Sequence, residues 1–169
     1  MNERIVPDLR RRAKRDRAYN TDMRDSPLPT RLQQIVEDFQ LCEGKEKLEL
    51  LLEYANQLPP LPERFTGHAE MEQIHECMTP VFVHGELNKG GMEYFFEVPA
   101  ESPSVRGYAA VLAEGVMGST PEQILAIPSD FYHAMGLQEV LSGQRLNGMR
   151  SIVAFIKRLA QRELVARQS

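Results

Sequence analysis

The sequence has few cysteines, no tryptophan and no long apolar run, and these shortages exclude several classes of protein. Its 169 residues include only two cysteines, Cys42 and Cys77, too few for a disulfide framework. The longest apolar run, Tyr108–Ala113, has six residues, whereas a membrane-spanning helix needs about 20. A chain of this length buries about 68–70% of its unfolded surface, so its core needs neither a disulfide nor a metal. We therefore expect one soluble globular domain.

Motifs for phosphate and metal chemistry are missing as well. The sequence contains neither glycine-rich phosphate loop, G-x-G-x-x-G or G-x-x-x-x-G-K-[ST], and no H-E-x-x-H. His68, His75, Cys77 and His84 lie within seventeen residues, but their spacing does not match the ligand pairs of tetrahedral zinc sites. A metal site formed by His75, Cys77 and His84 is kept only as a weak alternative.

The net charge of −4 is divided unevenly along the chain. Residues 1–25 hold eight Arg or Lys and five Asp or Glu, whereas residues 26–169 hold twelve and nineteen. Nucleic-acid affinity comes mainly from neutralised phosphates, so we expect the acidic body not to bind nucleic acid. Acidic residues interrupt the basic residues of segment 1–25, unlike in an organelle transit peptide, and the apolar region of a secretory signal is missing. We therefore expect a cytoplasmic protein.

Prolines around residue 28 suggest a boundary between a tail and a folded domain. We predict a flexible basic tail over residues 1–28 and one domain over residues 29–169. The tail is interpreted as a solvated segment without a dedicated partner. The alternative is an electrostatic docking arm for an acidic partner or RNA.

Periodicity and punctuation predict the elements of the domain. Apolar residues at helical spacing predict a helix over residues 31–41, with Thr30 and Gln33 as a capping box, and a second helix around residues 48–55. Residues 80–84 and 92–98 read as antiparallel strands. Helices follow after Ser102 and Thr120, over residues 129–136, and along an apolar stripe over residues 149–164. This order predicts an α+β fold, a small antiparallel sheet with helices packed on one face.

Cys77 stands out from Cys42 by its setting. It lies in the connection that enters the strand predicted from Pro80, where a side chain can be displayed on a rigid frame. Cys42 follows an amphipathic helix and is expected to be a buried apolar residue. A buried and unreactive thiol is also the simplest reading of Cys77 when only its neighbours are considered.

The residues around Cys77 resemble a known cysteine loop. The segment Glu76–Val83 is similar to the Gly-Cys-x-Ser-x-Val-aromatic stretch of the SufE family of sulfur acceptors. Four further segments, one before and three after Cys77, occur in the same order as in that family. They are Gln57–Pro59 with Leu61, Arg106-Gly107, Thr120–Ile124 and Arg145–Met149. The resemblance covers roughly residues 30–165.

The resemblance implies a function and roles for single residues. A SufE-like protein takes persulfide sulfur from a cysteine desulfurase (SufS-like), stimulates that enzyme, and passes the sulfur to an iron–sulfur scaffold complex (SufBCD-like). It implies Cys77 as the persulfide acceptor, Arg145 as a residue of the interface or a support for the thiolate, and Glu101 at the place of a loop aspartate. Pyridoxal phosphate belongs to the desulfurase, so no cofactor of its own and no membrane partner are expected, in a monomer or homodimer.

This chain also departs from the family pattern. Glu76 replaces the glycine before the cysteine, which removes backbone freedom and is expected to raise the pKa of Cys77. Thr79 stands for serine, Pro80 lacks an N–H, and Phe82 stands for tryptophan. The alternative function is therefore a non-catalytic adaptor with a SufE-like fold and an inert Cys77. A Cys42–Cys77 redox pair is disfavoured in a reducing compartment.

Overall fold

The structure is a computed structural model that describes residues 26–168. Its helices and strands follow in an α+β order, as the sequence predicts. The elements are α2 (Thr30–Gln40), α3 (Lys45–Asn56), η1 (Glu63–His68), β1 (Glu72–Ile74), β2 (Val81–Asn88), β3 (Gly91–Glu97), α4 (Pro103–Gly115), α5 (Pro121–Leu125), η2 (Phe131–His133), η3 (Leu137–Glu139) and α6 (Gly143–Gln168). None of these helices is both long enough and apolar enough to cross a membrane.

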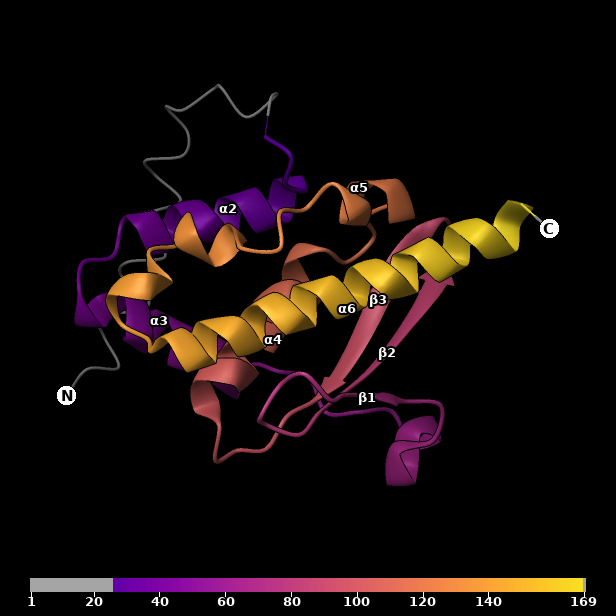
Figure 1. Cartoon of the computed structure of the whole chain (residues 1–169), viewed down its shortest axis with the longest axis horizontal. Helices are drawn as coiled ribbons and strands as arrows, with labels where there is room; N and C mark the ends of the chain where they lie inside the picture. The colour runs from indigo at the N-terminus through magenta and orange to yellow at the C-terminus, as the bar shows by residue number, and fades with distance from the viewer. Residues whose placement is uncertain (1–25, 169) are drawn as a thin grey trace.

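The three strands form one antiparallel sheet in the order β1-β2-β3. On β2, Val83 lies opposite Glu72 of β1 and Phe96 of β3. Alternate residues point to opposite faces, so Val81, Val83, Met92, Tyr94 and Phe96 are buried together on one face. The long helix α6 runs across this face, and the Tyr94 hydroxyl donates to the Ile156 carbonyl at 2.9 Å (Figure 1). The sheet thus carries its main helical layer on one side.

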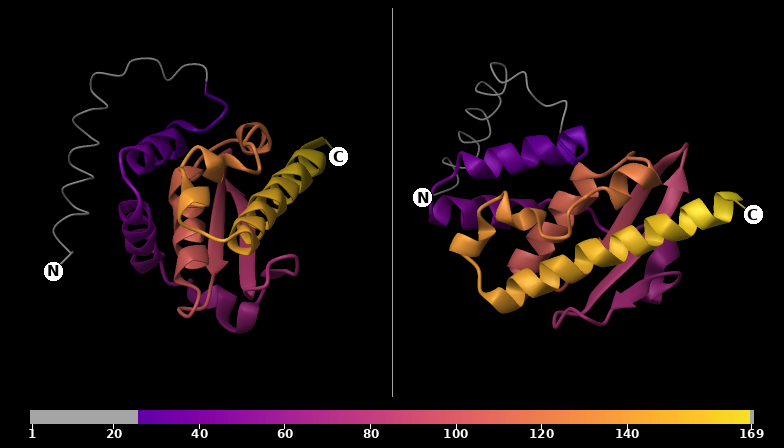
Figure 2. Two further views of the ribbon diagram at one scale, coloured as in Figure 1. Left: turned by 60° about the vertical axis from the view of Figure 1, so that its left-hand side comes forward. Right: turned by 45° about the horizontal axis from the view of Figure 1, so that its top comes forward.

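Helix α4 lies at the centre of the helical part of the molecule. It stands between the pair α2 and α3 and the sheet with α6 (Figure 2). Nine of its thirteen residues are buried. Arg106 fixes it to its surroundings, because its guanidinium donates to the carbonyls of Ala55 and Val98. The first turn of α4 is therefore held firmly beside the end of α3 and the end of the sheet.

A short segment before β1 covers the other face of the sheet. Phe65 of η1 is only 1% exposed, and its ring centroid lies 4.9 Å from that of His84 and 5.1 Å from that of Phe95. His68 stacks on Phe82 at 3.7 Å. These contacts form a small second core and give the outward-facing aromatic residues of β2 and β3 a partner.

The strands differ from their predicted bounds. Strand β2 starts one residue later than predicted and continues to Asn88, because Lys89 and Gly90 form a tight turn with positive φ angles of 52° and 86°. Strand β1 was not predicted. It has only three residues, and a period-2 pattern is not visible over so short a run.

Helix starts show the same mixture of agreement and correction. Thr120 and Gln123 form the capping box at the start of α5. The capping box predicted for Thr30 is wrong, because Thr30 is the first residue of α2 and Pro29 is its N-cap. Gln33 instead accepts a hydrogen bond from Ser26 Oγ at 2.7 Å. The predicted helix at residues 129–136 is the 3₁₀ turn η2, followed by Gly136 at φ 74°.

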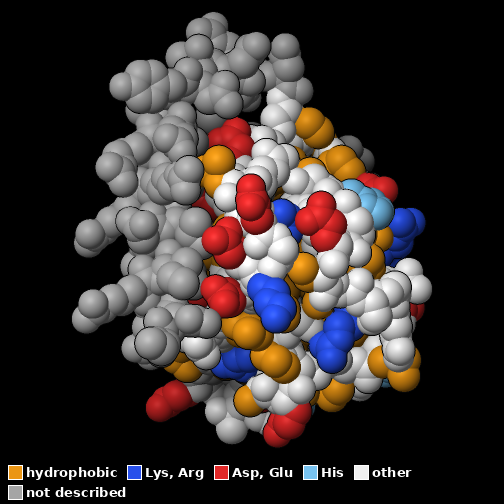
Figure 3. Space-filling view, turned by 90° about the vertical axis from the view of Figure 1, so that its left-hand side faces the viewer, with side chains coloured by type: hydrophobic (Ala, Val, Ile, Leu, Met, Phe, Trp, Pro, Cys, Tyr) orange, Lys and Arg blue, Asp and Glu red, His pale blue; other side chains and the backbone are white. Residues whose placement is uncertain are grey.

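The predicted tail over residues 1–28 lies largely outside the described residues. Its last three residues are described, and Leu28 packs against the core. On the end of the molecule shown in Figure 3, acidic and basic side chains lie beside one another among hydrophobic ones. Among the described residues visible in this view, basic side chains form no continuous surface, which agrees with the excess of Asp and Glu over residues 26–169.

Candidate functional site

Cys77 lies in the loop between β1 and β2, with its thiol turned into the molecule. The residue is 8% exposed, and its backbone N–H donates to the Ile74 carbonyl at 3.4 Å. The thiol lines a pocket of about 200 Å³. The cysteine loop and the starts of α4 and α6 build this pocket. The lining residues are Cys77, Met78, Thr79, Ser102, Val105, Ser142, Gln144, Arg145 and Gly148.

Burial controls the ionisation of the thiol. It raises the pKa of Cys77, and a hydrogen bond from the backbone N–H of Thr79 offsets part of this effect. The expected contribution of Glu76 is not what raises this pKa, because the Glu76 carboxylate pairs with Arg158 of α6 at 3.3 Å. A hydrogen bond to its own backbone N–H and the contact with Arg158 lower the pKa of Glu76.

Arg145 forms the opposite wall of the pocket. Its Nη1 donates to Ser104 Oγ at 2.6 Å, and Ser104 is a buried residue of α4. This bond ties the first turn of α6 to the first turn of α4. Among residues 26–168 Arg145 has no carboxylate partner. Its positive charge is therefore available to an anionic group in the pocket.

Two further contacts hold the cysteine loop in place. Thr79 Oγ1 donates to Ser102 Oγ at 3.2 Å, which joins the loop to the residue before α4. Gln144 Nε2 contacts the sulfur of Met78. Met78 is 81% exposed, so a large apolar side chain points to solvent directly beside the buried thiol.

The structure brings together only some of the residues that the sequence points to. Cys77 and Arg145 line one pocket. Glu101 is exposed in the turn before α4 and does not line it, although its neighbour Ser102 does. Sequence reasoning did not single out Ser102, Gln144 or Gly148 as site residues. Helical spacing around Arg145 could have indicated Gly148, since residues three apart share a helix face.

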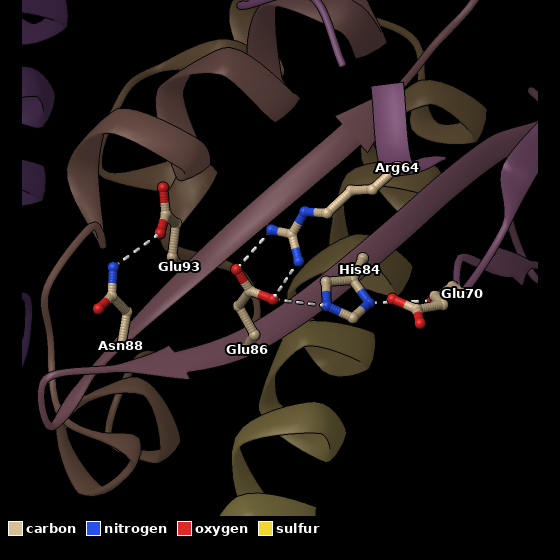
Figure 4. A network of polar contacts seen from close by, with 6 residues as sticks. All are labelled: Arg64, Glu70, His84, Glu86, Asn88 and Glu93. Atoms are coloured by element: carbon tan, nitrogen blue, oxygen red, sulfur yellow. Dashed lines mark hydrogen bonds and ion pairs between the residues drawn. The ribbon is translucent and has the colours of Figure 1, made fainter. Parts of the chain in front are cut away.

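The histidines do not gather around Cys77. His84 uses both ring nitrogens on the second face of the sheet, contacting the Glu70 carbonyl at 2.9 Å and Glu86 at 3.1 Å. Figure 4 shows that Glu86 also accepts hydrogen bonds from Nη1 and Nη2 of Arg64. Over residues 26–168 no group of three or more His, Cys, Asp or Glu side chains is arranged to hold a metal ion. The alternative metal site has no geometric support there.

Cys42 is a separate, buried thiol. It is 1% exposed, its Sγ donates to the Asp38 carbonyl at 3.4 Å, and burial raises its pKa to about 11. It does not line the pocket, and both cysteines are free thiols.

Comparison with known proteins decides the family. The model of the SufE domain, described as an Fe-S metabolism associated domain, matches residues 33–160. This chain belongs to the SufE family. As a SufE-family protein it is associated with iron–sulfur metabolism. The matched range contains the whole pocket, from the cysteine loop to the first turns of α6.

Similar proteins occur in several bacteria. An uncharacterised SufE-like protein of Mycobacterium tuberculosis is 42% identical over 132 residues, which cover 78% of this chain and 92% of that protein. One from Synechocystis is 33% identical, over 79% and 82% of the two chains. The solution structure of a hypothetical protein from Thermus thermophilus superposes with a TM-score of 0.73 at 35% identity, covering 82% of this chain and 98% of that chain.

Proposed function

We propose that this SufE-family protein is a sulfur acceptor that carries persulfide sulfur on Cys77. It takes the sulfur from a cysteine desulfurase (SufS-like), stimulates that enzyme, and passes the sulfur to an iron–sulfur scaffold complex (SufBCD-like). The observation that carries the proposal is the position of the Cys77 thiol in a pocket beside Arg145. A thiol with only a packing role needs no pocket of about 200 Å³ in front of it.

The proposed step is a thiol–persulfide exchange. The Cys77 thiolate attacks the outer sulfur of the persulfide on the desulfurase and forms a new S–S bond. The bond between the two sulfurs of the donor persulfide breaks, and the donor cysteine leaves as a thiolate. No external oxidant is needed, because the sulfur is already at the oxidation level of a persulfide. The guanidinium of Arg145 lines the same pocket and suits the anionic persulfide that this step leaves there.

Burial has opposite effects on the two halves of this cycle. It protects a persulfide from stray thiols, but it lowers the fraction of thiolate and blocks access to a partner's active site. The cysteine loop must therefore turn outward for transfer. The exposed neighbours Glu76 and Met78 are the first groups of this loop that a partner would meet.

The organic chemistry of the proposed reaction takes place on the partner. Pyridoxal phosphate on the desulfurase cleaves the C–S bond of cysteine, and the acceptor needs no cofactor of its own. The iron–sulfur cluster is the destination of the sulfur and not a resident group. The pocket has room for the outer sulfur of a persulfide, and Arg145 is the charged residue among the described residues that line it.

Intact mass measures the proposed step directly. The protein is incubated with a cysteine desulfurase, pyridoxal phosphate and cysteine, and a gain of one sulfur, ~32 Da, is expected. Cys42→Ser should retain the gain and Cys77→Ser should lose it. Desulfurase turnover should rise with wild type and not with Cys77→Ser. The absence of added mass with several desulfurases would contradict the proposal.

The burial of Cys77 favours one second candidate, an adaptor with an inert thiol. An adaptor would bind the desulfurase without taking up sulfur, and Cys77→Ser would leave binding and any stimulation unchanged. The same incubation separates the two functions. Stimulation that persists in Cys77→Ser, with no added mass on wild type, supports the adaptor.

A further inference from the structure

Gly148 has an unusual environment on α6. It is a buried residue of this helix, and it lines the pocket opposite the cysteine loop. A Cβ atom placed on Gly148 would lie 3.2 Å from Cys77 Sγ. Among residues 26–168, and apart from its chain neighbours and the nearby backbone of α6, that sulfur is the only heavy atom within 4 Å of this position. The missing side chain therefore leaves room for the thiol where it turns into the pocket.

Other glycines in the helices show why this is informative. Glycine inside a helix is less favourable than alanine, so its presence there calls for a packing reason. In α4 the reason is helix packing, because a Cβ on Gly107 would collide with the Leu51 carbonyl and one on Gly115 would collide with Leu32. Within residues 26–168, a Cβ on Gly148 would instead approach the thiol of Cys77, which gives this glycine its packing reason.

The same turns of α6 supply the other contacts of the loop. Arg145 lies three residues before Gly148, and Gln144 lies four residues before it. All three residues therefore lie on one side of the helix. Arg145 provides the charge of the pocket, Gln144 contacts Met78, and Gly148 faces the thiol. One face of α6 therefore contacts two neighbouring residues of the cysteine loop, Cys77 and Met78.

We propose that Gly148 is a positioning residue: because it has no side chain, the Cys77 thiol can take its inward position against α6. The inference rests on the proposed function and deepens it, because the inward position of Cys77 decides how long its persulfide stays shielded from solvent. A side chain at residue 148 displaces the thiol toward solvent, since the loop yields more easily than the helix. Displacement makes the thiol more reactive and leaves a persulfide on it less protected.

The test compares Gly148→Ala with Gly143→Ala. Both replace a glycine of α6 by alanine, but a Cβ on Gly143 has nothing within 4 Å. Alkylation of Cys77 by iodoacetamide is followed by peptide mass spectrometry between pH 6 and 11. Gly148→Ala should speed alkylation at pH 7 by about tenfold and move the midpoint of the rate profile to lower pH. Gly143→Ala should match wild type.

Thermal unfolding gives a second, independent readout. Replacing a helical glycine by alanine should increase the stability of the folded protein, but with Cys77 present the close contact between the new Cβ and Sγ opposes this increase. In the Cys77→Ala background that contact is gone, so Gly148→Ala should raise Tm by about 2–4 °C more than it does with Cys77 present. Equal effects in both backgrounds, together with unchanged alkylation, would overturn the inference.

A third measurement separates this inference from the function on which it rests. Wild type and Gly148→Ala are loaded with sulfur by a desulfurase and then exposed to glutathione, and the loss of ~32 Da is timed. Faster loss from Gly148→Ala is expected. If wild type takes up no sulfur, the proposed function fails while the alkylation and unfolding comparisons still decide the role of Gly148. If wild type is loaded and both proteins lose sulfur equally fast, the role of Gly148 fails alone.

Discussion

The two thiols of this protein differ in how deeply they are buried, and their reactivity should differ with pH in the same order. Burial raises the pKa of both, to about 11 for Cys42, whereas for Cys77 the Thr79 N–H offsets part of the rise. Only the thiolate reacts, so a higher pKa means slower reaction at neutral pH. Alkylation of Cys77 should reach its midpoint above the ~8.5 of a free cysteine, and that of Cys42 at a still higher pH.

Site-resolved alkylation rates from pH 6 to 11 check this order. In urea both thiols should titrate near ~8.5, because unfolding removes the burial that separates them. A Cys77 midpoint at or below that of the unfolded chain would contradict the assigned effect of burial. It would indicate a thiolate stabilised by Arg145 even before a partner binds.

At the scale of single residues, the sequence was informative where chemistry is specific and silent where geometry decides. Cys77 and Arg145 could be singled out because they belong to motifs that resemble a family. Gly148 lies in the same motif as Arg145, but its closeness to the thiol, 3.2 Å between an added Cβ and Sγ, is a distance that no pattern in one sequence contains. The outward turn of Glu76 toward Arg158 was equally invisible, since these residues lie 82 positions apart.

Among the structural elements, the cysteine loop and β1 are joined to α6 by two ion pairs. Glu76 contacts Arg158 at 3.3 Å and Glu72 contacts Arg162 at 2.8 Å. Glu76 lies two residues after the end of β1 and directly precedes Cys77. Glu76, which stands where the family motif has glycine, therefore attaches the cysteine loop to α6 through its ion pair with Arg158.

Glu76→Gln should loosen this attachment and expose Cys77 more often. The pair lies at the surface, so the expected effect is small, an increase in the alkylation rate of no more than about fivefold at low salt. Raising the salt concentration should bring wild type close to the variant, because salt screens the pair that only wild type has. Glu122→Gln is the control, since it releases Arg167 near the other end of α6. Equal acceleration in the control would refute the idea.

Elements were predicted well where their pattern is long. The C-terminal helix was identified from apolar residues spread over several turns, and α6 extends through all of them. The hairpin of β2 and β3 was recognised from its composition, but its length was underestimated because Glu86 and Asn88 are polar. Strand β1 depends on pairing with β2 and not on its own three residues, so tertiary structure alone creates it.

On the scale of the whole molecule, the domain is organised around α4 and around the pocket at its first turn. Loop, sheet and three helices meet α4, and the pocket lies where chain segments from residues 77–79, 102–105 and 142–148 converge. No single element could form this site. The α+β class could be predicted from the order of elements, whereas the convergence of these three segments required the fold itself.

The start of the folded domain gives a prediction at the same scale. The sequence places the boundary between residues 28 and 29, but contacts within the described residues begin at Ser26. Ser26 bonds Gln33, and the backbone N–H of Leu28 donates to Ser26 Oγ at 3.2 Å. Leu28 also packs against the core while only partly buried. Its packing should contribute about 1 kcal/mol, less than the burial of a whole leucine side chain.

A chain that begins at Ser26 should therefore unfold at a higher temperature than one that begins at Pro29. For a domain of this size, about 1 kcal/mol corresponds to a Tm difference of about 2–4 °C. Circular dichroism on both truncated chains measures it, and Leu28→Ala in the longer one should reproduce most of the loss. Equal Tm values would mean that residues 26–28 belong energetically to the tail and that the boundary read from the prolines is the correct one.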